Sequence, residues 1–370
     1  MKKKSISILL AALMIGLCVA GCGKKNEETT EAPTTVEQTT KEPAEVPVMT
    51  IADVPETTEE ALPEGMMYSY LTGKVVPVEV GRKRPVAFQI DNERRAQPQN
   101  GVSTAEIVYE VPIEANEVRL TAIFQSFDDT DRIGPLRSAR SYHPGIVAEY
   151  DGIFFHHGHS DLALPYLDDE RCDDLEGIAN SGWPAVFESS DHSAGHNIFT
   201  NQEKVMKQVE KLGFRTEMKQ DYTYKFQFAK TSEKIVPEGG QDANKVSIGY
   251  TQNHPYFEYN AEDGRYYRYA FDKAHIDQAN DKQVAVDNVI VEYCDYNLEW
   301  DKNTKNIHTV GTGTGVFITA GKAVPITWEK ADYWENTHYY YQSGEEITLN
   351  QGQTWVCIVL PSMTGEITVE

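Results

Sequence analysis

The chain has 370 residues and a formal net charge of −23, with 34 basic against 57 acidic side chains. A body this acidic lacks the basic footprint of a nucleic-acid-binding protein, and anionic lipid surfaces or wall polymers would repel it as a whole. An anionic partner would therefore require a local basic patch or bridging divalent cations. The length suffices for two ordinary domains.

Residues 1–21 have the pattern of a secretory signal. Three lysines at positions 2–4 precede an apolar run from Ile6 to Leu17, which is too short for a comfortable membrane span. The run Val19-Ala20-Gly21 then stands directly before Cys22, an arrangement typical of the lipobox of bacterial lipoproteins. We expect Cys22 to become the lipidated N-terminus, held at the extracytoplasmic face of the bacterial cell membrane. An ordinary secretory signal that happens to contain a cysteine is the alternative.

Residues 22–64 are predicted to be a disordered tether. Glu, Thr, Pro and Lys dominate this segment and aromatic residues are nearly absent, so it cannot bury enough apolar surface to fold. A flexible chain of this length has a typical reach of roughly 35 Å. Beyond the tether only Cys172, Cys294 and Cys357 remain, an odd number that cannot all pair internally and that argues against a disulfide scaffold.

A mixed α/β (α+β) domain is predicted for residues 65–225, because strand and helix patterns alternate along this segment. A helix is expected over residues 138–150, after the turn pair Gly134-Pro135. Helical spacing of apolar residues indicates another over residues 199–214. Enrichment in β-branched and aromatic residues indicates strands over residues 84–92, 105–114, 119–127 and 151–161.

Residues 235–370 are predicted to form a mostly antiparallel β domain, with the boundary between the two domains at residues 220–235. Polar and apolar residues alternate through much of this half. The pair Asp263-Gly264, between two aromatic runs, is typical of a hairpin turn. Alternating glycines occur in VGTGTGVF, and we expect them to let a strand pack closely under a tryptophan ring such as Trp328 or Trp355.

Arginines gather in the first predicted domain, although the chain as a whole is acidic. Four of them follow one another closely: Arg119, Arg132, Arg137 and Arg140. If a helix begins at Ser138, Arg137 and Arg140 lie on one of its faces. The helix N-terminus and the forked guanidinium donors would then bind a phosphate or carboxylate.

The same arginines have a structural interpretation. Three carboxylates fall at strand ends or on strand faces and would pair with them internally: Asp91, Glu110 and Glu114. Both interpretations stay open on the sequence alone. The candidate ligand-binding residues are Asp91, Glu110, Glu114, Arg119, Arg137, Ser138, Arg140, His196 and Asn197.

Histidines form a second group of candidates. Alternate residues of a strand share a face, which would set His157, His159 and Asp161 on one side as ligands for a divalent metal. A strand-end turn at Gly158, with packed histidines, is the alternative. No other cofactor is evident in the sequence. For an enzyme, with a histidine as general base, the candidate catalytic residues are His157, His196 and Glu114.

Several stretches, in their order along the chain, resemble the YerB-like bacterial lipoproteins, a domain-of-unknown-function family with an N-terminal and a C-terminal part. They are RPVAFQIDN, AEIVYEVPIE, RLTAIFQSF, RIGPLRSARSYH, FFHHGHS and GHNIFT, then GTGTGVFITAGKAVPITWEK and ITLNQGQTWVCIVLP. The most specific stretch is IGPLRSAR, and the resemblance covers nearly the whole chain after the tether. It implies an envelope lipoprotein, mostly of Gram-positive bacteria, and no established reaction.

The family pattern includes several residues of the candidate site: Glu110, Glu114, Arg119, Arg137, Arg140 and the pair His196-Asn197. One departure is visible, because this chain has Phe187-Glu188-Ser189 where the family tends to place an arginine after an aromatic residue. We therefore expect a membrane-anchored accessory or scaffold lipoprotein. It would bind an anionic wall polymer or precursor, or an envelope protein, but no nucleic acid. A metal- or histidine-dependent enzyme acting on cell-wall polymers is the alternative.

Overall fold

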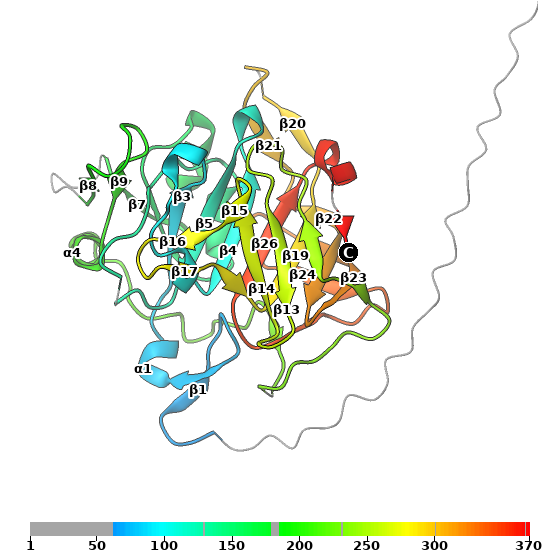
Figure 1. The fold of residues 1–370 in the computed structure, drawn as a ribbon. Helices are drawn as coiled ribbons and strands as arrows, with labels where there is room; N and C mark the ends of the chain where they lie inside the picture. The colour runs from blue at the N-terminus through cyan, green and yellow to red at the C-terminus, as the bar shows by residue number, and fades with distance from the viewer. Residues whose placement is uncertain (1–61, 129, 179–184, 231, 300, 367) are drawn as a thin grey trace, which may run out of the picture. The chain divides into compact units, whose positions relative to one another are not determined.

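The computed structural model describes residues 62–370 except 129, 179–184, 231, 300 and 367 (Figure 1). The predicted signal, Cys22 and nearly all of the predicted tether lie outside the described residues. The described residues belong to one compact unit, Val48–Glu370. Within them, no helix combines the length and the apolar composition that a membrane span requires.

Strands dominate the described residues, at 40% against 14% in helices. The largest sheet has eleven strands in the order β11-β23-β22-β19-β26-β4-β5-β3-β6-β7, with β24 paired to β23. Its members from the first half of the chain are β3 (Val86–Asp91), β4 (Ile107–Pro112), β5 (Val118–Phe124), β6 (Ile153–His156) and β7 (Asp173–Glu176). Those from the second half are β11 (Gln241–Asp242), β19 (Asn288–Tyr293), β22 (Gly311–Thr319), β23 (Lys322–Lys330), β24 (Thr337–Tyr341) and β26 (Thr354–Val359).

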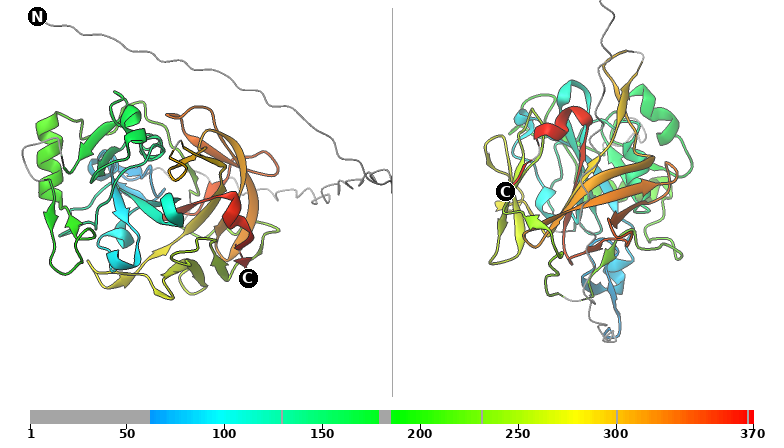
Figure 2. Two further views of the ribbon diagram at one scale, coloured as in Figure 1. Left: turned by 90° about the horizontal axis from the view of Figure 1, so that it is seen from above. Right: turned by 90° about the vertical axis from the view of Figure 1, so that its right-hand side faces the viewer.

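The large sheet runs without a break from one half of the sequence into the other (Figure 2). Strand β26 lies between β19 and β4 and pairs in parallel with both of them. Every residue of β4 and β26 is buried, as expected for strands covered on both faces. The predicted division into a mixed N-terminal and a β C-terminal domain stays a prediction, and the two halves share one sheet.

A second sheet of six strands contains the predicted hairpin. Strands β13 (Tyr256–Asn260) and β14 (Arg265–Ala270) are antiparallel neighbours, and Gly264 has the positive φ of 69° that the turn requires. The prediction from Asp263-Gly264 is therefore confirmed. The other strands of this sheet are β12 (Lys245–Ser247), β15 (Lys273–Ala274), β18 (Ala285–Val286) and β27 (Thr368–Val369).

The prediction for the alternating glycines is also confirmed. Gly313 on β22 is paired with Trp328 on β23, and a Cβ at position 313 would stand only 2.5 Å from the indole ring. The helix predicted at 138–150 is confirmed in its second half, where α2 covers His143–Ala148. The residues before it do not form helix, because Arg137 N donates to Gln89 O at 2.9 Å and Ala139 N donates to Gly158 O at 2.9 Å.

The remaining elements are short. The α-helices are α1 (Val78–Gly81), α2 (His143–Ala148), α3 (Leu164–Leu167) and α4 (Gln202–Leu212). The 3-10 helices are η1 (Arg94–Ala96), η2 (Val102–Thr104), η3 (Glu114–Asn116), η4 (Asp161–Ala163) and η5 (Pro361–Glu366). Short strands complete the fold: β1 (Met66–Tyr68), β2 (Val75–Pro77), β8 (Phe187–Glu188), β9 (Ile198–Phe199), β10 (Gln227–Phe228), β16 (Ile276–Asp277), β17 (Lys282–Gln283), β20 (Tyr296–Leu298), β21 (Lys305–Ile307) and β25 (Thr348–Leu349).

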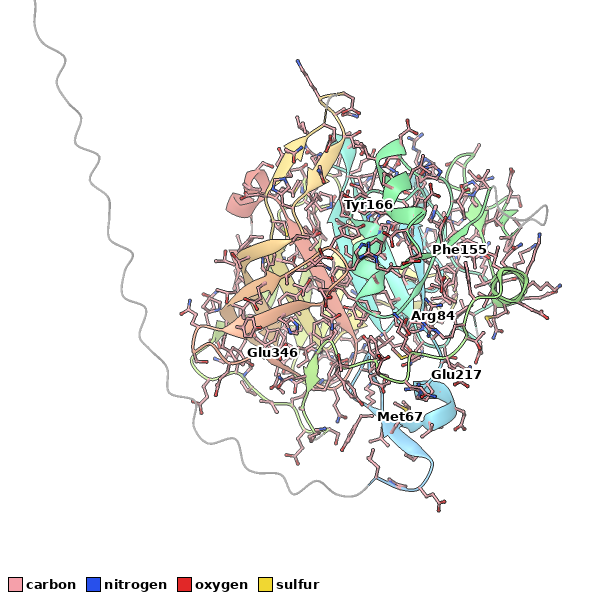
Figure 3. All side chains as sticks on the ribbon, turned by 180° about the vertical axis from the view of Figure 1, so that it is seen from behind. Met67, Arg84, Phe155, Tyr166, Glu217 and Glu346 are labelled. Atoms are coloured by element: carbon pink, nitrogen blue, oxygen red, sulfur yellow. The ribbon has the colours of Figure 1, made fainter. Side chains whose placement is uncertain are left out.

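Side chains fill the space around the large sheet (Figure 3). The core is a single cluster that draws apolar residues from both halves of the chain, among them Phe88, Phe155 and Trp355. All three cysteines of the described residues are free thiols; Cys294 and Cys357 are buried within this core and Cys172 is half-buried.

Candidate functional site

Three segments meet at the end of strand β3. Asp91 is its last residue and is directly opposite Arg119 of β5, so both side chains project from the same face of the sheet. The extended segment that contains Arg137 pairs with β3 through Gln89. His196 lies in a turn just before β9 and reaches the same place through its ring, as its contacts with Asp91 show.

We call Asp91, Glu93, Arg137 and His196 the strand-end cluster. The guanidinium of Arg137 donates through Nε to Asp91 Oδ2 at 2.7 Å and through Nη2 to Glu93 Oε1 at 3.1 Å. His196 Nδ1 donates to the same Asp91 oxygen at 2.8 Å, and its Nε2 lies 3.7 Å from Glu93 Oε2. Asp91 and His196 are buried, whereas Arg137 and Glu93 are half-buried. Solvent therefore reaches the cluster at Arg137 and Glu93 but not at Asp91 and His196.

The charges of this cluster act on one another. Burial by itself would lower the pKa of Arg137, but the carboxylates of Asp91 and Glu93 outweigh burial and raise it. Nearby Glu117 shows the opposite balance, because burial and then the negative charge of Glu93 raise the pKa of its carboxyl group. A further negative charge would thus be unfavourable beside Glu117 and favourable nearer the guanidinium groups.

Arg119 is a buried arginine whose guanidinium forms no ion pair with a described residue. Its exposed fraction is 7%, and Nη1 donates to Ser138 O at 2.6 Å. Among the residues that the structure describes, no carboxylate lies within ion-pair distance of this guanidinium and no other hydrogen bond forms to it. Burial, and then repulsion from Arg140, lower the pKa of Arg119 to about 10. Its unused donors are therefore suited to an external anion.

Arg140 is already paired. Its Nε donates to both oxygens of Glu114, at 2.8 and 2.9 Å, and its Nη2 donates to Glu114 Oε2 at 2.7 Å. Burial alone would raise the pKa of the Glu114 carboxyl group, but these bonds to Arg140 lower it overall. The internal pairing that the sequence allowed is thus present for Asp91 with Arg137 and for Glu114 with Arg140.

Glu110 belongs to a different group on the opposite face of the sheet. It is opposite Leu120 of β5, so its side chain points away from the face that carries Arg119. Its carboxylate accepts from Arg268 Nη2 at 2.7 Å and from Trp355 Nε1 at 3.0 Å, and both Glu110 and Arg268 are fully buried. Glu110 is therefore spatially separate from the other predicted ligand-binding residues near Arg119.

The predicted histidine group is dispersed. Strand β6 ends at His156, and Gly158 then turns the chain with a φ of 80°. His156 is buried and bonded to Asp174, while Asp161 is exposed at the start of η4. Burial lowers the pKa of His157, which stands half-buried in the turn. The alternating arrangement expected for a strand is therefore not formed at residues 157–161.

The remaining predicted residues lie at the edge of the site or outside it. Ser138 contributes its carbonyl to Arg119, whereas Asn197 bonds with Glu188 and with the backbone of Gly195. Arg132 pairs with Asp191 and is not part of the strand-end cluster.

Sequence reasoning missed Glu93 and Glu117. Glu93 is separated from Asp91 by one residue in the run IDNE. This short spacing could have indicated that Glu93 lies beside Asp91 in the site. Among the described residues, the groups of His, Cys, Asp or Glu with ligand atoms within 4.8 Å of one another comprise one set, Asp91, Glu93 and His196.

A cavity of about 160 Å³ opens beside the strand-end cluster. Glu93 and Glu117 contribute carboxylates to its wall, and Phe271 contributes an aromatic ring over which Arg94 lies at 4.8 Å. This volume admits a small ionic group rather than a large organic ligand. Glu93 is the one member of the strand-end cluster in the cavity wall, and Arg119 is not part of that wall.

Comparison with known proteins points to one family. Residues 71–215 match the family described as "Protein of unknown function (DUF3048) N-terminal domain", and residues 246–356 match "Protein of unknown function (DUF3048) C-terminal domain". The chain is 27% identical over 290 residues to the protein named "Putative lipoprotein YerB" of Bacillus subtilis (strain 168), covering 78% of this chain and 85% of that protein. It also resembles the crystal structure of the YerB protein from Bacillus subtilis, with a TM-score of 0.72 and 24% identity, over 82% of this chain and 99% of that one.

Proposed function

Because the chain belongs to the DUF3048 family and is similar to a protein named as a lipoprotein, we propose that it is a membrane-anchored extracytoplasmic binding protein for an anionic component of the cell envelope. In this proposal Cys22 carries the lipid and the folded part stands off the membrane on its tether. The anion binds at Arg119, between Arg137 and Arg140. The protein then serves as an accessory or scaffold factor that holds a wall polymer or precursor near the membrane.

The observation that carries the proposal is the guanidinium of Arg119. It is nearly buried, it keeps donors that no described residue uses, and two further arginines raise the positive potential around it. Arg137 and Arg140 each hold a carboxylate, so their contribution is a local field rather than free donors. A phosphate or carboxylate that accepts a forked pair of hydrogen bonds from Arg119 would relieve the repulsion among the three cations.

Binding to purified wall fragments that retain their anionic polymers is the test. Arg119→Gln removes the forked donors, and we expect affinity to fall about ten-fold or more, as for a lost hydrogen bond to a charged group. Arg171→Gln is the matched control, because Arg171 is an exposed arginine engaged with Asp169 and Trp334 outside the site. Equal binding by Arg119→Gln and the control would refute the proposal.

The test includes a check for folding, since Arg119 is nearly buried. Circular dichroism and the urea midpoint establish whether Arg119→Gln is native. If it is not, Arg119→Lys keeps the positive charge and loses the fork, and we expect it to bind several-fold more weakly than the control. Wild-type affinity in the folded Arg119→Lys protein would contradict a role for the fork.

A second candidate function rests on the set Asp91, Glu93 and His196. Two carboxylates and an imidazole suit zinc or manganese, and a bound metal would support a metal-dependent enzyme acting on wall polymers. Arg137 would first have to release the oxygens that it now occupies. Metal analysis of protein purified without an affinity tag tests this candidate. Stoichiometric metal in the wild type and its loss in His196→Gln would support it, and absence from both would remove it.

A further inference from the structure

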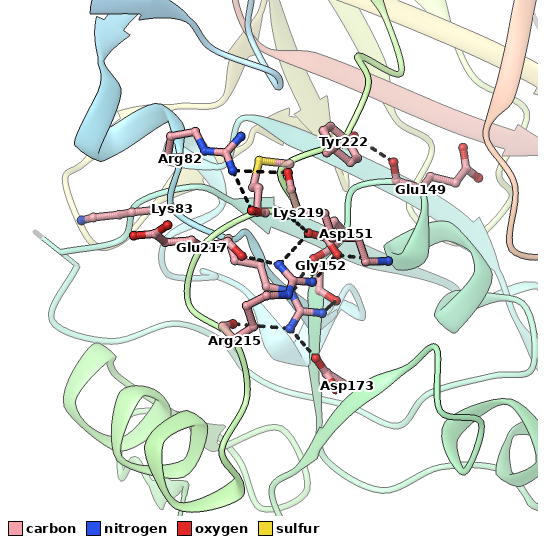
Figure 4. A network of polar contacts seen from close by, with 12 residues as sticks. Arg82, Lys83, Glu149, Asp151, Gly152, Asp173, Arg215, Glu217, Lys219 and Tyr222 are labelled. Atoms are coloured by element: carbon pink, nitrogen blue, oxygen red, sulfur yellow. Dashed lines mark hydrogen bonds and ion pairs between the residues drawn. The ribbon is translucent and has the colours of Figure 1, made fainter. Parts of the chain in front are cut away.

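Four charged side chains are enclosed in the core and take no part in the candidate site. We call them the buried charge group: Glu149 after helix α2, Lys225 before β10, Glu292 on β19 and Lys330 at the end of β23, each at most 3% exposed. Charged residues are almost never buried to this degree unless they are paired. In Figure 4 the backbone oxygen of Glu149 accepts from Tyr222 Oη at 2.9 Å, which holds the segment before Lys225 against the end of α2.

The carboxylate of Glu149 is the centre of the buried charge group. Lys225 Nζ donates to its Oε2 and Lys330 Nζ donates to its Oε1. Thr337 adds its backbone N, at 2.9 Å from Oε2, and its hydroxyl, at 3.1 Å from Oε1. These donors draw electron density from both oxygens, so the carboxyl carbon Cδ becomes more electrophilic. The same donors would stabilise the negative charge of a tetrahedral intermediate at this carbon, as an oxyanion hole does.

Lys225 is placed to attack this carbon. Within the described residues, Glu149 is the hydrogen-bonding partner of its Nζ, and the rest of the ammonium group lies over aromatic rings whose centroids are 5.4 to 5.9 Å away: Tyr109, Tyr150, Phe226 and Tyr339. Burial, and then the positive charge of Lys330, lower the pKa of Lys225 well below its usual range. The neutral amine, which is the nucleophilic form, is therefore more accessible to Lys225 than to an exposed lysine.

Glu292 has the properties of a proton carrier for this pair. Its carboxylate accepts from Tyr339 Oη at 2.8 Å and from Cys294 Sγ at 3.3 Å, and among the described residues no cation lies within ion-pair distance of it. Burial raises the pKa of its carboxyl group, although the bond from Tyr339 and the positive charge of Lys225 oppose this. Glu292 can therefore take up a proton and give it back within the enclosed group.

From this geometry we propose that Lys225 and Glu149 condense to an internal amide bond, with Glu292 as the proton carrier. Lys225 Nζ attacks Glu149 Cδ, an N–C bond forms, and one Cδ–O bond breaks. The ammonium group supplies two hydrogen atoms and the carboxylate one oxygen atom, which leave together as water, so no co-reactant is needed. The product replaces two buried charges by a neutral group, and this removes the cost of keeping a desolvated ion pair. Lys330 and Glu292 then balance each other.

The bond would connect positions that are 76 residues apart in the sequence. It would tie the end of α2 to the segment that leads from the first half of the chain into the second. A cross-link of this kind restricts the unfolded chain and so stabilises the folded one. The inference does not rest on the proposed function, because it uses neither Arg119 nor the strand-end cluster.

The intact mass of the denatured protein tests the proposal. The chain from residue 22 onward with Cys22→Ser is used, so that no attached lipid changes the mass. We expect a mass lower than that of the sequence by one water molecule. Proteolysis and fragmentation should then yield a branched peptide that joins Lys225 to Glu149. The full sequence mass in protein that circular dichroism shows to be folded would overturn the proposal, and so would a branch at Lys330.

Three variants locate the reaction. Lys225→Met removes the nucleophile and should have its full sequence mass. Glu292→Gln keeps both reacting groups and should slow the condensation about 100-fold or more, as for the loss of a general acid–base group, so that freshly folded protein keeps its full mass. Lys245→Met is the control and should still lack one water, because Lys245 lies over Tyr256 with its side chain 41% exposed.

The wild-type mass decides the proposal whether or not Lys225→Met folds. Loss of one water in Lys225→Met would place the bond elsewhere and would overturn the proposal. Rapid, complete condensation in Glu292→Gln would contradict the role of Glu292.

Discussion

Strands β4 and β5 are neighbours, and each face of this pair carries a charged group. The two groups differ in how many of their charges are paired within the protein. On one face Glu110 is enclosed by Arg268, Trp355, Asn92 and Asn253, and both members of the ion pair are fully buried. On the other face Arg119 has one backbone partner within the described residues and stands beside a half-open cluster.

The difference separates a structural role from a candidate binding role. Every charge of the Glu110 group is matched by a residue from the other half of the chain, so the group joins the two halves. A buried cation without a carboxylate is costly to maintain by packing alone. The proposal that Arg119 binds an anionic ligand rests on this difference.

The largest effect is expected from breaking the closed group. Arg268→Met leaves the Glu110 carboxylate buried without its cation, and we predict a loss of about 3–5 kcal/mol in the free energy of unfolding. Urea unfolding monitored by circular dichroism measures it. Adding Glu110→Leu to this variant removes the orphan charge and should recover much of the loss. A loss below about 1 kcal/mol in Arg268→Met would contradict a structural role for the Glu110–Arg268 pair.

A smaller effect is expected at the strand-end cluster. Arg137 is half-buried and shares its two carboxylates with His196 and with solvent at the rim. We predict that Arg137→Gln lowers the free energy of unfolding by about 1 kcal/mol, as for a hydrogen-bonded pair that water can partly replace. The same urea experiment measures it. A loss as large as that of Arg268→Met would mean that both groups are structural.

The smallest effect is a pH dependence from Glu117. Because burial and the charge of Glu93 raise its pKa, the folded protein holds this proton more tightly than the unfolded chain does. The stabilisation is present below the normal carboxyl pKa and is lost as the pH rises through the raised value. Glu117→Gln should flatten this part of the stability–pH profile, measured by urea midpoints from acidic to neutral pH. An unchanged slope would contradict the assigned repulsion.

Local signals predicted the local features of the fold. The pair Asp263-Gly264 indicated the hairpin, since few residues adopt its positive φ, and the alternating glycines indicated a strand packed under Trp328. The helix expected at 138–150 begins only at His143, because the backbone of Arg137 bonds to Gln89 of β3 and that of Ala139 bonds to Gly158 in the turn after β6. The pattern of residues within the segment does not reveal these backbone hydrogen bonds to other segments.

The composition of the sequence predicted which residues gather at the candidate site, but not which of them form ion pairs. The cluster of arginines was visible in the sequence, and Arg119, Arg137 and Arg140 do meet near the end of β3. The partner of Glu110 was not visible, because Arg268 lies 158 residues further along the chain. Which face of a strand a residue occupies depends on register, and register is fixed by the whole sheet.

Nuclear magnetic resonance of the arginine Nε–Hε groups during titration with inorganic phosphate tests the central claim most directly. If Arg119 is the open cation of the site, its signal should shift saturably as phosphate is added, while the enclosed Arg268 signal stays in place. The shift should be weaker at high salt, because screening reduces the attraction of an anion to a partly exposed site. An Arg119 signal that does not move, or that moves only as much as that of the exposed Arg171, would contradict the account.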